Sequence, residues 1–149
     1  MDIKQHVLKL IDKYGTNSPY DLCDYLNIIR VKQPMHPDIR GCYQYFRRNK
    51  IIYINSLLPE KDQIQVCSHE LGHAQRHSKS NVIFWETKTL FIKDRFEIEA
   101  NSFAAELLIS DEDIKQYFGS GYNIEHIAKS LEVDRCFVDL KIKNLCRRG

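Results

Sequence analysis

His69-Glu70-Leu71-Gly72-His73 stands inside residues 60–77, a segment with the periodicity of an amphipathic helix. Pro59 precedes this segment, and proline is common where a helix begins. Apolar residues recur at steps of three and four along one stripe: Ile64, Cys67, Leu71 and Ala74. Because His69 and His73 are four residues apart, the predicted helix places both imidazoles on one face, about one turn apart. Two ligands of one zinc ion require this spacing, so the segment predicts part of a metal site.

Glu70 lies next to His69 on the predicted helix. In an H-E-x-x-H site the glutamate does not bind the metal; it takes a proton from the water whose pKa the zinc lowers to about 7. The alternative is a pair of surface histidines on an ordinary helix. The chain has only six His residues, so this spacing rarely arises by chance, and we favour the metal site.

Two histidines leave a zinc site incomplete, so a third ligand is expected elsewhere in the chain. The extended H-E-x-x-H-x-x-G-x-x-H pattern needs glycine at position 76 and histidine at position 79, where this chain has Arg76 and Lys79. This difference excludes the metzincin arrangement. A glutamate on a later helix is the common remaining solution, and residues 95–109 form such a predicted helix.

The glutamates of residues 95–109 face different directions on a helix that turns by about 100° per residue. Glu97 falls among apolar positions, whereas Glu99 and Glu106 fall toward the solvent edge. A buried carboxylate is costly unless a positive group compensates it, and a zinc ion would do so. Glu97 is therefore the predicted third ligand, and Glu99 is the alternative if the helix is rotated by a residue or two.

Two further residues of these helices have expected supporting roles. Asn101 lies four residues after Glu97, where its amide oxygen could accept the free ring N–H of a zinc-bound histidine. Its alternative is a plain polar residue at a helix edge. Gly72 costs about 1 kcal/mol relative to alanine in a helix interior. We expect it to lie opposite Ala100 or Ala104, so that the two helices approach closely and the carboxylate reaches the metal.

Composition and charge limit the class of protein. The chain has 149 residues, of which 43% are hydrophobic, and its net charge is +2. These values fit one globular domain and exclude a fibre or a disordered chain. The apolar runs are too short to span a membrane, and the N-terminus lacks the pattern of a secretory signal, so we expect a cytoplasmic protein. Five scattered cysteines without a C-x-x-C pair indicate reduced thiols.

Three blocks of the sequence together resemble the ImmA/IrrE family of metallopeptidases. They are residues 64–73, His77 and residues 97–108, and the likeness extends over residues 20–110. Both motifs occur in the right order and at a suitable distance. Members of this family are typically encoded by mobile elements or stress regulons, and they cut a helix-turn-helix repressor. The resemblance implies the same class of protein substrate for this chain.

The resemblance implies a role for each residue of the site that matches a family motif. His69 and His73 are zinc ligands, and Glu70 is the base. Glu97, the first residue of Glu-x-x-Ala-Asn, completes the site, in agreement with its predicted facing. One departure is Ile109-Ser110, where many relatives have Met-Pro. This difference affects the end of a helix and leaves the zinc ligands unchanged.

We expect an α+β, zincin-like metallopeptidase domain over residues 1–118. Its small, mainly antiparallel sheet comes from residues 28–55 and is packed by the H-E-x-x-H helix and the Glu97-bearing helix, with helices at both ends. An extended substrate peptide is expected to pair with an exposed edge of the 41–55 hairpin. The oxyanion donor is not identified, and three residues are candidates: Tyr43, Tyr45 and His77.

Residues 119–149 are predicted to form a C-terminal helix pair packed on that domain. The apolar spacing is similar to that of a helix-turn-helix, whose reading helix presents basic and amide side chains to DNA. Here Asp134 and Asp139 lie early in the second helix, where phosphate would repel them. We therefore favour a packing or repressor-docking element, and direct binding to nucleic acid is not expected.

The predicted function is that of a Zn²⁺-dependent endopeptidase, whose partner is a helix-turn-helix repressor of a mobile element or stress regulon. The alternative belongs to another class. It is a regulatory module that binds a repressor or DNA through the C-terminal helices, with a structural or regulatory metal.

Overall fold

A computed structural model describes residues 1–85 and 95–148, which form seven helices and four strands. In chain order the elements are α1 (Ile3–Tyr14), α2 (Pro19–Tyr25), β1 (Ile29–Gln33), β2 (Ile39–Phe46), β3 (Asn49–Asn55), α3 (Glu60–Arg76), β4 (Val82–Trp85), α4 (Arg95–Leu108), α5 (Asp111–Gly119), α6 (Ile124–Leu131) and α7 (Arg135–Arg148). The structure confirms the predicted α+β class. Within the described ranges, no helix is both long and apolar enough to cross a membrane.

The four strands form one sheet in the order β1-β3-β2-β4. β1 is parallel to β3, while β2 is antiparallel to both β3 and β4, so the sheet is mainly antiparallel as predicted. β4 extends the sheet beyond the predicted range, residues 28–55. It also pairs with residues 39–43 of β2, so this part of the hairpin is paired on both sides, while residues 44–46 of β2 lie beyond its register. The predicted peptide-binding edge of the hairpin is thus covered by β4 over residues 41–43, and pairing of a peptide with the hairpin stays a prediction. Among the described strands, β1 and β4 are the outer strands of the sheet.

Local signals explain where the helices begin and end. The side chain of Asp2 accepts a hydrogen bond from the backbone N–H of Gln5 at the start of α1, which ends at Gly15 with a positive φ of 69°. Ser18 caps α2 in the same way, with proline in its first turn. Pro59 precedes α3, as the sequence predicts.

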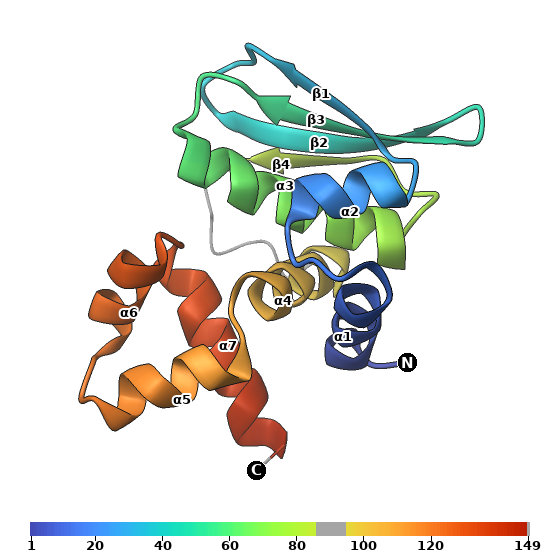
Figure 1. The fold of residues 1–149 in the computed structure, drawn as a ribbon. Helices are drawn as coiled ribbons and strands as arrows, with labels where there is room; N and C mark the ends of the chain where they lie inside the picture. Colours follow the sequence, from blue (N-terminus) through green and yellow to red (C-terminus); the bar gives the residue numbers. More distant parts are fainter. Residues whose placement is uncertain (86–94, 149) are drawn as a thin grey trace.

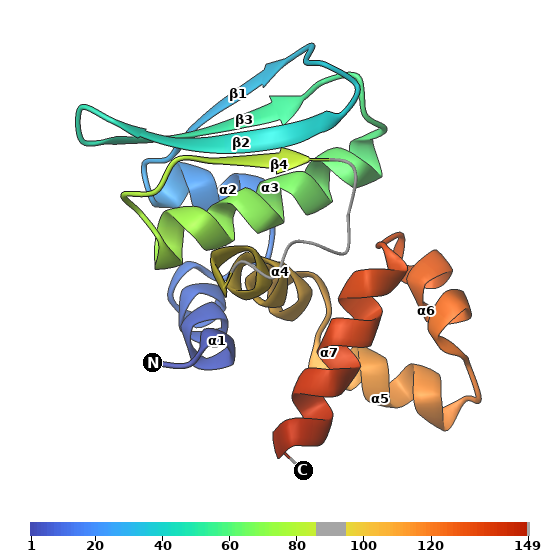
Figure 2. The same cartoon turned by 180° about the vertical axis from the view of Figure 1, so that it is seen from behind.

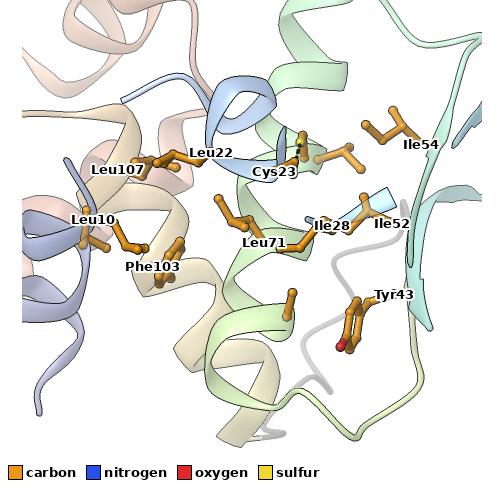
Figure 3. Packing of buried hydrophobic residues seen from close by; sticks show 14 residues of the cluster. Leu10, Leu22, Cys23, Ile28, Tyr43, Ile52, Ile54, Leu71, Phe103 and Leu107 are labelled. Carbon is orange, nitrogen blue, oxygen red and sulfur yellow. Dashed lines mark hydrogen bonds between the residues drawn. The ribbon is translucent and has the colours of Figure 1, made fainter. Parts of the chain in front are cut away.

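The helices stack beneath one face of the sheet. α2 and α3 lie against the sheet, and α4 and α1 lie beyond them, with α5, α6 and α7 to one side (Figures 1 and 2). The main hydrophobic cluster fills the space between these layers, where Ile52 and Tyr43 of the sheet face Leu71 of α3 (Figure 3). Leu22 and Phe103 continue the same cluster toward α2 and α4.

Two glycines permit α3 to pack closely on both of its neighbours. At Gly41 in β2, a Cβ would lie 2.6 Å from the Val66 side chain and 2.5 Å from the Tyr53 carbonyl oxygen. At Gly72, a Cβ would lie 3.0 Å from the Ala100 Cα. The predicted close approach of the two motif-bearing helices at Gly72 is thus confirmed for Ala100, which holds α3 tightly between the sheet and α4.

A second hydrophobic cluster lies on the other side of α4. Its buried members come from α4, α5, α6, α7 and Ile109: Ala104, Ala105, Ile109, Ile114, Ile127, Ala128, Phe137 and Val138. The buried Lys141 of α7 crosses this region, and its ammonium donates to Glu106 at 3.0 Å and to Asp111 at 2.5 Å. The division of the chain at residues 118 and 119 stays a prediction, while the cluster itself draws on both sides of that boundary.

Candidate metal centre

The long helix α3 turns three motif residues inward. His69, Glu70 and His73 are all buried, because α3 lies between the sheet and α4. The partner residue Glu97 comes from the first turn of α4 and is only 6% exposed. Its carboxylate lies 3.0 Å from His69 Nε2 and 2.7 Å from His73 Nε2. The structure therefore brings together the three residues that the sequence predicts as metal ligands.

The ligand atoms of His69, His73 and Glu97 all lie within 4.8 Å of one another, close enough to share one metal ion. Two imidazoles and one carboxylate form the ligand set that a catalytic zinc takes in H-E-x-x-H peptidases of the glutamate type. Burial raises the pKa of Glu97, but hydrogen bonds with His69 and His73 overcome this effect and hold the pKa at about 2. Glu97 is thus ionised, which is the form that binds a cation.

Glu70 is the clearest sign that the pocket suits a positively charged group. Its side chain is fully buried, and neither carboxylate oxygen has a hydrogen-bond partner among the described residues. Burial, followed by the negative charge of Glu97, raises the pKa of Glu70 well above its usual value. An unpaired buried carboxylate is costly, and a divalent cation beside it would offset that cost. The residues present therefore fit a metal centre.

The predicted orientation of the α4 glutamates is right at the start of the helix and wrong near its end. Glu97 is buried at the metal centre, and Glu99 is partly exposed, as the helix geometry predicts. Glu106 was expected at the solvent edge but is only 7% exposed. It accepts hydrogen bonds from Lys141 at 3.0 Å and from Asn144 at 3.1 Å. The physical reason is that α7 covers this side of α4.

Comparison with known proteins agrees with this geometry. Residues 23–143 match the M78 peptidase family model, described as the IrrE N-terminal-like domain. The chain belongs to this family. A further match is 46% identical over 126 residues, which cover 85% of this chain and 80% of the relative, "Uncharacterized immunity region protein 2" of Bacillus phage phi105. "Metallopeptidase ImmA" of Bacillus subtilis (strain 168) is 29% identical over 147 residues, covering 96% of this chain and 85% of that protein. Membership of the M78 family and the similarity to a metallopeptidase support a peptidase activity for this chain.

In this M78 domain, the outer nitrogen of each α3 histidine also has a partner. His69 Nδ1 lies 2.7 Å from the amide oxygen of Asn101, the contact that the sequence predicts. His73 Nδ1 lies 3.2 Å from Nδ1 of His77. With both Nδ1 atoms engaged, each ring directs its Nε2 toward Glu97. Partners of this kind fix the orientation and tautomer of metal-binding histidines.

The candidate oxyanion donors lie in different surroundings. The Tyr43 hydroxyl donates to the Ser78 carbonyl oxygen at 2.5 Å, and burial raises its pKa to about 12. Tyr45 is half-buried in β2, where its backbone N–H donates to Asn81. Both ring nitrogens of His77 are occupied, one by His73 and one by Glu99. The oxyanion assignments stay predictions, and for His77 the contacts favour a supporting role.

The Glu99 contact with His77 was not foreseen from the sequence. His77 Nε2 lies 3.0 Å from Glu99 Oε2, although Glu99 faces away from Glu97 on α4. His77 occupies the position after the last residue of α3 and has a non-helical φ of −135°, so helical geometry does not predict where its ring points. The available signal was the four-residue spacing from His73 to His77, which places a third imidazole one turn on.

A groove lies beside the first half of α3. Gln65, one turn before His69, lines a groove of about 620 Å³ whose other wall is formed by α6 and the start of α7. Gln65 also accepts a hydrogen bond from the backbone N–H of Asp134 at 2.6 Å, which ties the turn between α6 and α7 to α3. The C-terminal helices of this M78 domain thus form one wall of a groove whose other wall is the first half of α3.

Proposed function

We propose that the protein is a zinc-dependent endopeptidase of the cytoplasm that cleaves a helix-turn-helix repressor of a mobile element or stress regulon. The observation that carries the proposal is the buried set of two imidazoles and one carboxylate beside a buried glutamate, Glu70, whose carboxylate has no hydrogen-bond partner in the described part of the chain. A relative named as a metallopeptidase and another from a phage immunity region support the regulatory setting. The resemblance to the ImmA/IrrE family implies a helix-turn-helix repressor as the substrate class, and the phage immunity region named for one relative fits this loosely.

Each residue of the site has a chemical part in peptide hydrolysis. His69 Nε2, His73 Nε2 and Glu97 would hold the metal. When bound, zinc supplies Lewis acidity, which polarises a carbonyl and lowers the pKa of water. Glu70 accepts the proton of the attacking water and then gives it to the leaving amine. Its burial and raised pKa suit a group that must bind and release a proton within one cycle.

The outer edge of β4 is the proposed place for an extended substrate segment. β2 lies directly on α3 where Gly41 meets Val66, and β4 flanks β2 on its outer side. The other free edge, β1, lies at the far side of the sheet from β4. A peptide that pairs with β4 would gain main-chain hydrogen bonds, and Ile83 offers an exposed apolar side chain on that strand.

The C-terminal helices are proposed to dock the repressor, with no direct contact to nucleic acid. The charged groups at the start of α7 already have partners: Arg40 lies 3.6 Å from Asp134, and Arg135 lies 2.8 Å from Glu125. Further along, Asp139 pairs with Lys143 at 3.0 Å. Guanidinium groups engaged with carboxylates are poorly placed to contact phosphate. These pairs favour a protein-facing surface.

The decisive experiment is the Glu70→Gln variant, tested on the repressor encoded beside the gene. We expect metal content equal to that of the parent, because Glu70 is not a ligand. Cleavage should fall by about 10²- to 10⁴-fold, since an amide cannot accept the proton of water. The comparison uses purified repressor and the same zinc concentration for both proteins.

Two results would contradict the proposal. Cleavage at the parental rate by Glu70→Gln would show that this residue is not the base. A variant that cannot cleave but still relieves repression in cells would favour the alternative class, a module that binds the repressor or DNA and uses its metal structurally.

A further inference from the structure

His73 is connected to a surface carboxylate through a second imidazole. Its Nδ1 lies 3.2 Å from His77 Nδ1, and His77 Nε2 lies 3.0 Å from Glu99 Oε2. His77 itself is buried and stacks on the Phe96 ring, with 4.1 Å between the ring centroids. The second oxygen of Glu99 accepts from the Arg95 side chain at 3.0 Å. A chain of hydrogen bonds therefore leads from α4 back to the metal-facing ring.

Only one placement of protons satisfies this chain when a metal is bound. A neutral imidazole carries one N–H and one lone pair. If His73 Nε2 gives its lone pair to a metal, its proton is on Nδ1 and must be donated to His77 Nδ1. That nitrogen must then be an acceptor, which puts the proton of His77 on Nε2. An ionised carboxylate accepts and never donates, so Glu99 receives this proton without ambiguity.

We propose that Glu99 is a positioning residue, which acts through His77 to hold His73 in the tautomer whose Nε2 lone pair faces the metal. This inference rests on the proposed function only in that it takes the metal centre as real. The tautomers of His69 and His73 on α3 are then held by different interactions. His69 donates directly to the neutral amide oxygen of Asn101, whereas His73 is fixed by a negative charge relayed through an imidazole.

Glutamine at position 99 removes the negative charge of Glu99 but keeps an oxygen that can accept a hydrogen bond. Its amide could still accept from His77 Nε2, but it could also donate to that nitrogen. Donation would reverse the chain, so that His77 Nδ1–H points at His73 and the proton of His73 moves to its metal-facing Nε2. The Glu99→Gln variant should therefore bind zinc more weakly than the parent, although the side chain has nearly the same shape.

The first experiment determines the tautomers directly. ¹⁵N-labelled histidine in the zinc-loaded protein is observed by long-range ¹H–¹⁵N NMR, which distinguishes Nδ1–H from Nε2–H rings. We expect Nδ1–H for His69 and His73 but Nε2–H for His77. A packing role for His77 against Phe96 sets no such preference. An Nδ1–H ring for His77 in the zinc-loaded parent would overturn the proposal, and this measurement needs no variant to fold.

The second experiment measures zinc affinity by competition with a chromophoric chelator. Loss of a partner outside the ligand set typically weakens metal binding by about 10- to 100-fold, and we expect Glu99→Ala to fall in this range, with Glu99→Gln at its lower end. Glu112→Gln, which changes an exposed carboxylate on α5, is the matched control and should bind like the parent. Parental affinity in both Glu99 variants would refute the inference. Failure of the parent to bind zinc would instead refute the proposed function.

Discussion

Replacing Gly72 by alanine adds one methyl group where α3 and α4 are in direct contact. A Cβ at this position would lie 3.0 Å from both the Cα of Ala100 and the Cβ of Phe103, and 3.1 Å from the carbonyl oxygen of Ala100. Carbon atoms in contact normally lie about 3.5–4.0 Å apart. Backbone atoms cannot rotate aside, so α4 must move away from α3 by roughly half an ångström.

Two opposing effects set the size of the change in stability. Alanine favours the helix by about 1 kcal/mol relative to glycine, while overpacking of a well-packed core costs about 1–3 kcal/mol. The free energy of unfolding should therefore fall by about 1 kcal/mol in Gly72→Ala. We expect a larger effect on zinc affinity than on stability, because Glu97 lies on α4 one turn before Ala100. Ligand sets tolerate displacements of only about 0.5 Å, so zinc affinity should fall by at least about 10-fold.

The assay combines urea unfolding of the metal-free protein with zinc titration against a chelator. Gly119→Ala is the matched control: it replaces the last residue of α5, where a Cβ would meet no atom within 4 Å among the described residues. It should leave zinc affinity unchanged and be neutral or slightly stabilising. If Gly72→Ala gained stability like an ordinary helix substitution and bound zinc like the parent, close helix packing would not be what places Glu97.

Three further predictions concern the ligand, pH and the buried charges. Glu97→Ala should weaken zinc binding by more than the roughly 100-fold upper value for outer partners, and parental affinity by the same titration would show that another residue is the ligand. Burial raises the pKa of Asp111, but ion pairs with Lys141 and Lys4 hold it at about 2. Because this pKa lies below the unfolded value of about 3.9, the stabilisation is present above that value and lost as the pH falls toward 2. Asp111→Asn should therefore lower the free energy of unfolding by about 1–2 kcal/mol at neutral pH, and in urea unfolding at several pH values the deficit should shrink below about pH 4. A deficit that does not depend on pH would show that the ion pairs are not its source. Lys141→Met leaves the carboxylate of Glu106 buried without its ammonium and should cost about 3–5 kcal/mol in the same assay. A loss below about 1 kcal/mol, typical of surface pairs, would contradict this.

The part of the site that is predictable from the sequence depends on short-range geometry. A spacing of four places His69 and His73 on one face of α3 whatever packs against that helix. The direction in which each side chain leaves α4 then distinguishes Glu97 from Glu99. A step of two residues rotates the side chain by about 200°, so the two glutamates point to opposite sides of the helix. These inferences need no knowledge of distant segments, and the structure brings the three predicted ligand side chains together.

The errors arise where distant segments determine the environment. Glu106 lies on the side of α4 that a single-helix analysis assigns to solvent, and it is α7, more than thirty residues later, that buries it. Residues 41–43 at the edge of the 41–55 hairpin are covered by β4, whose short run carries too little periodicity to reveal its pairing with β2. The contact from His77 to Glu99 depends on the path of the chain after α3 ends, which helical geometry does not describe.

α4 links the metal centre to the C-terminal helices. Its first turn carries Glu97, and about 14 Å along the helix, at about 1.5 Å per residue, Glu106 meets Lys141 of α7. One face of α4 contacts α3 at Gly72, while Ala104 and Ala105 belong to the second cluster. A shift of α7 would therefore move the helix that carries the predicted third ligand, and a metal ligand tolerates a displacement of only about 0.5 Å. Under the proposed function, a repressor docked on α7 would touch a helix that packs on α4, the helix that carries Glu97. Under that proposal, substrate docking would have a physical route to the position of Glu97.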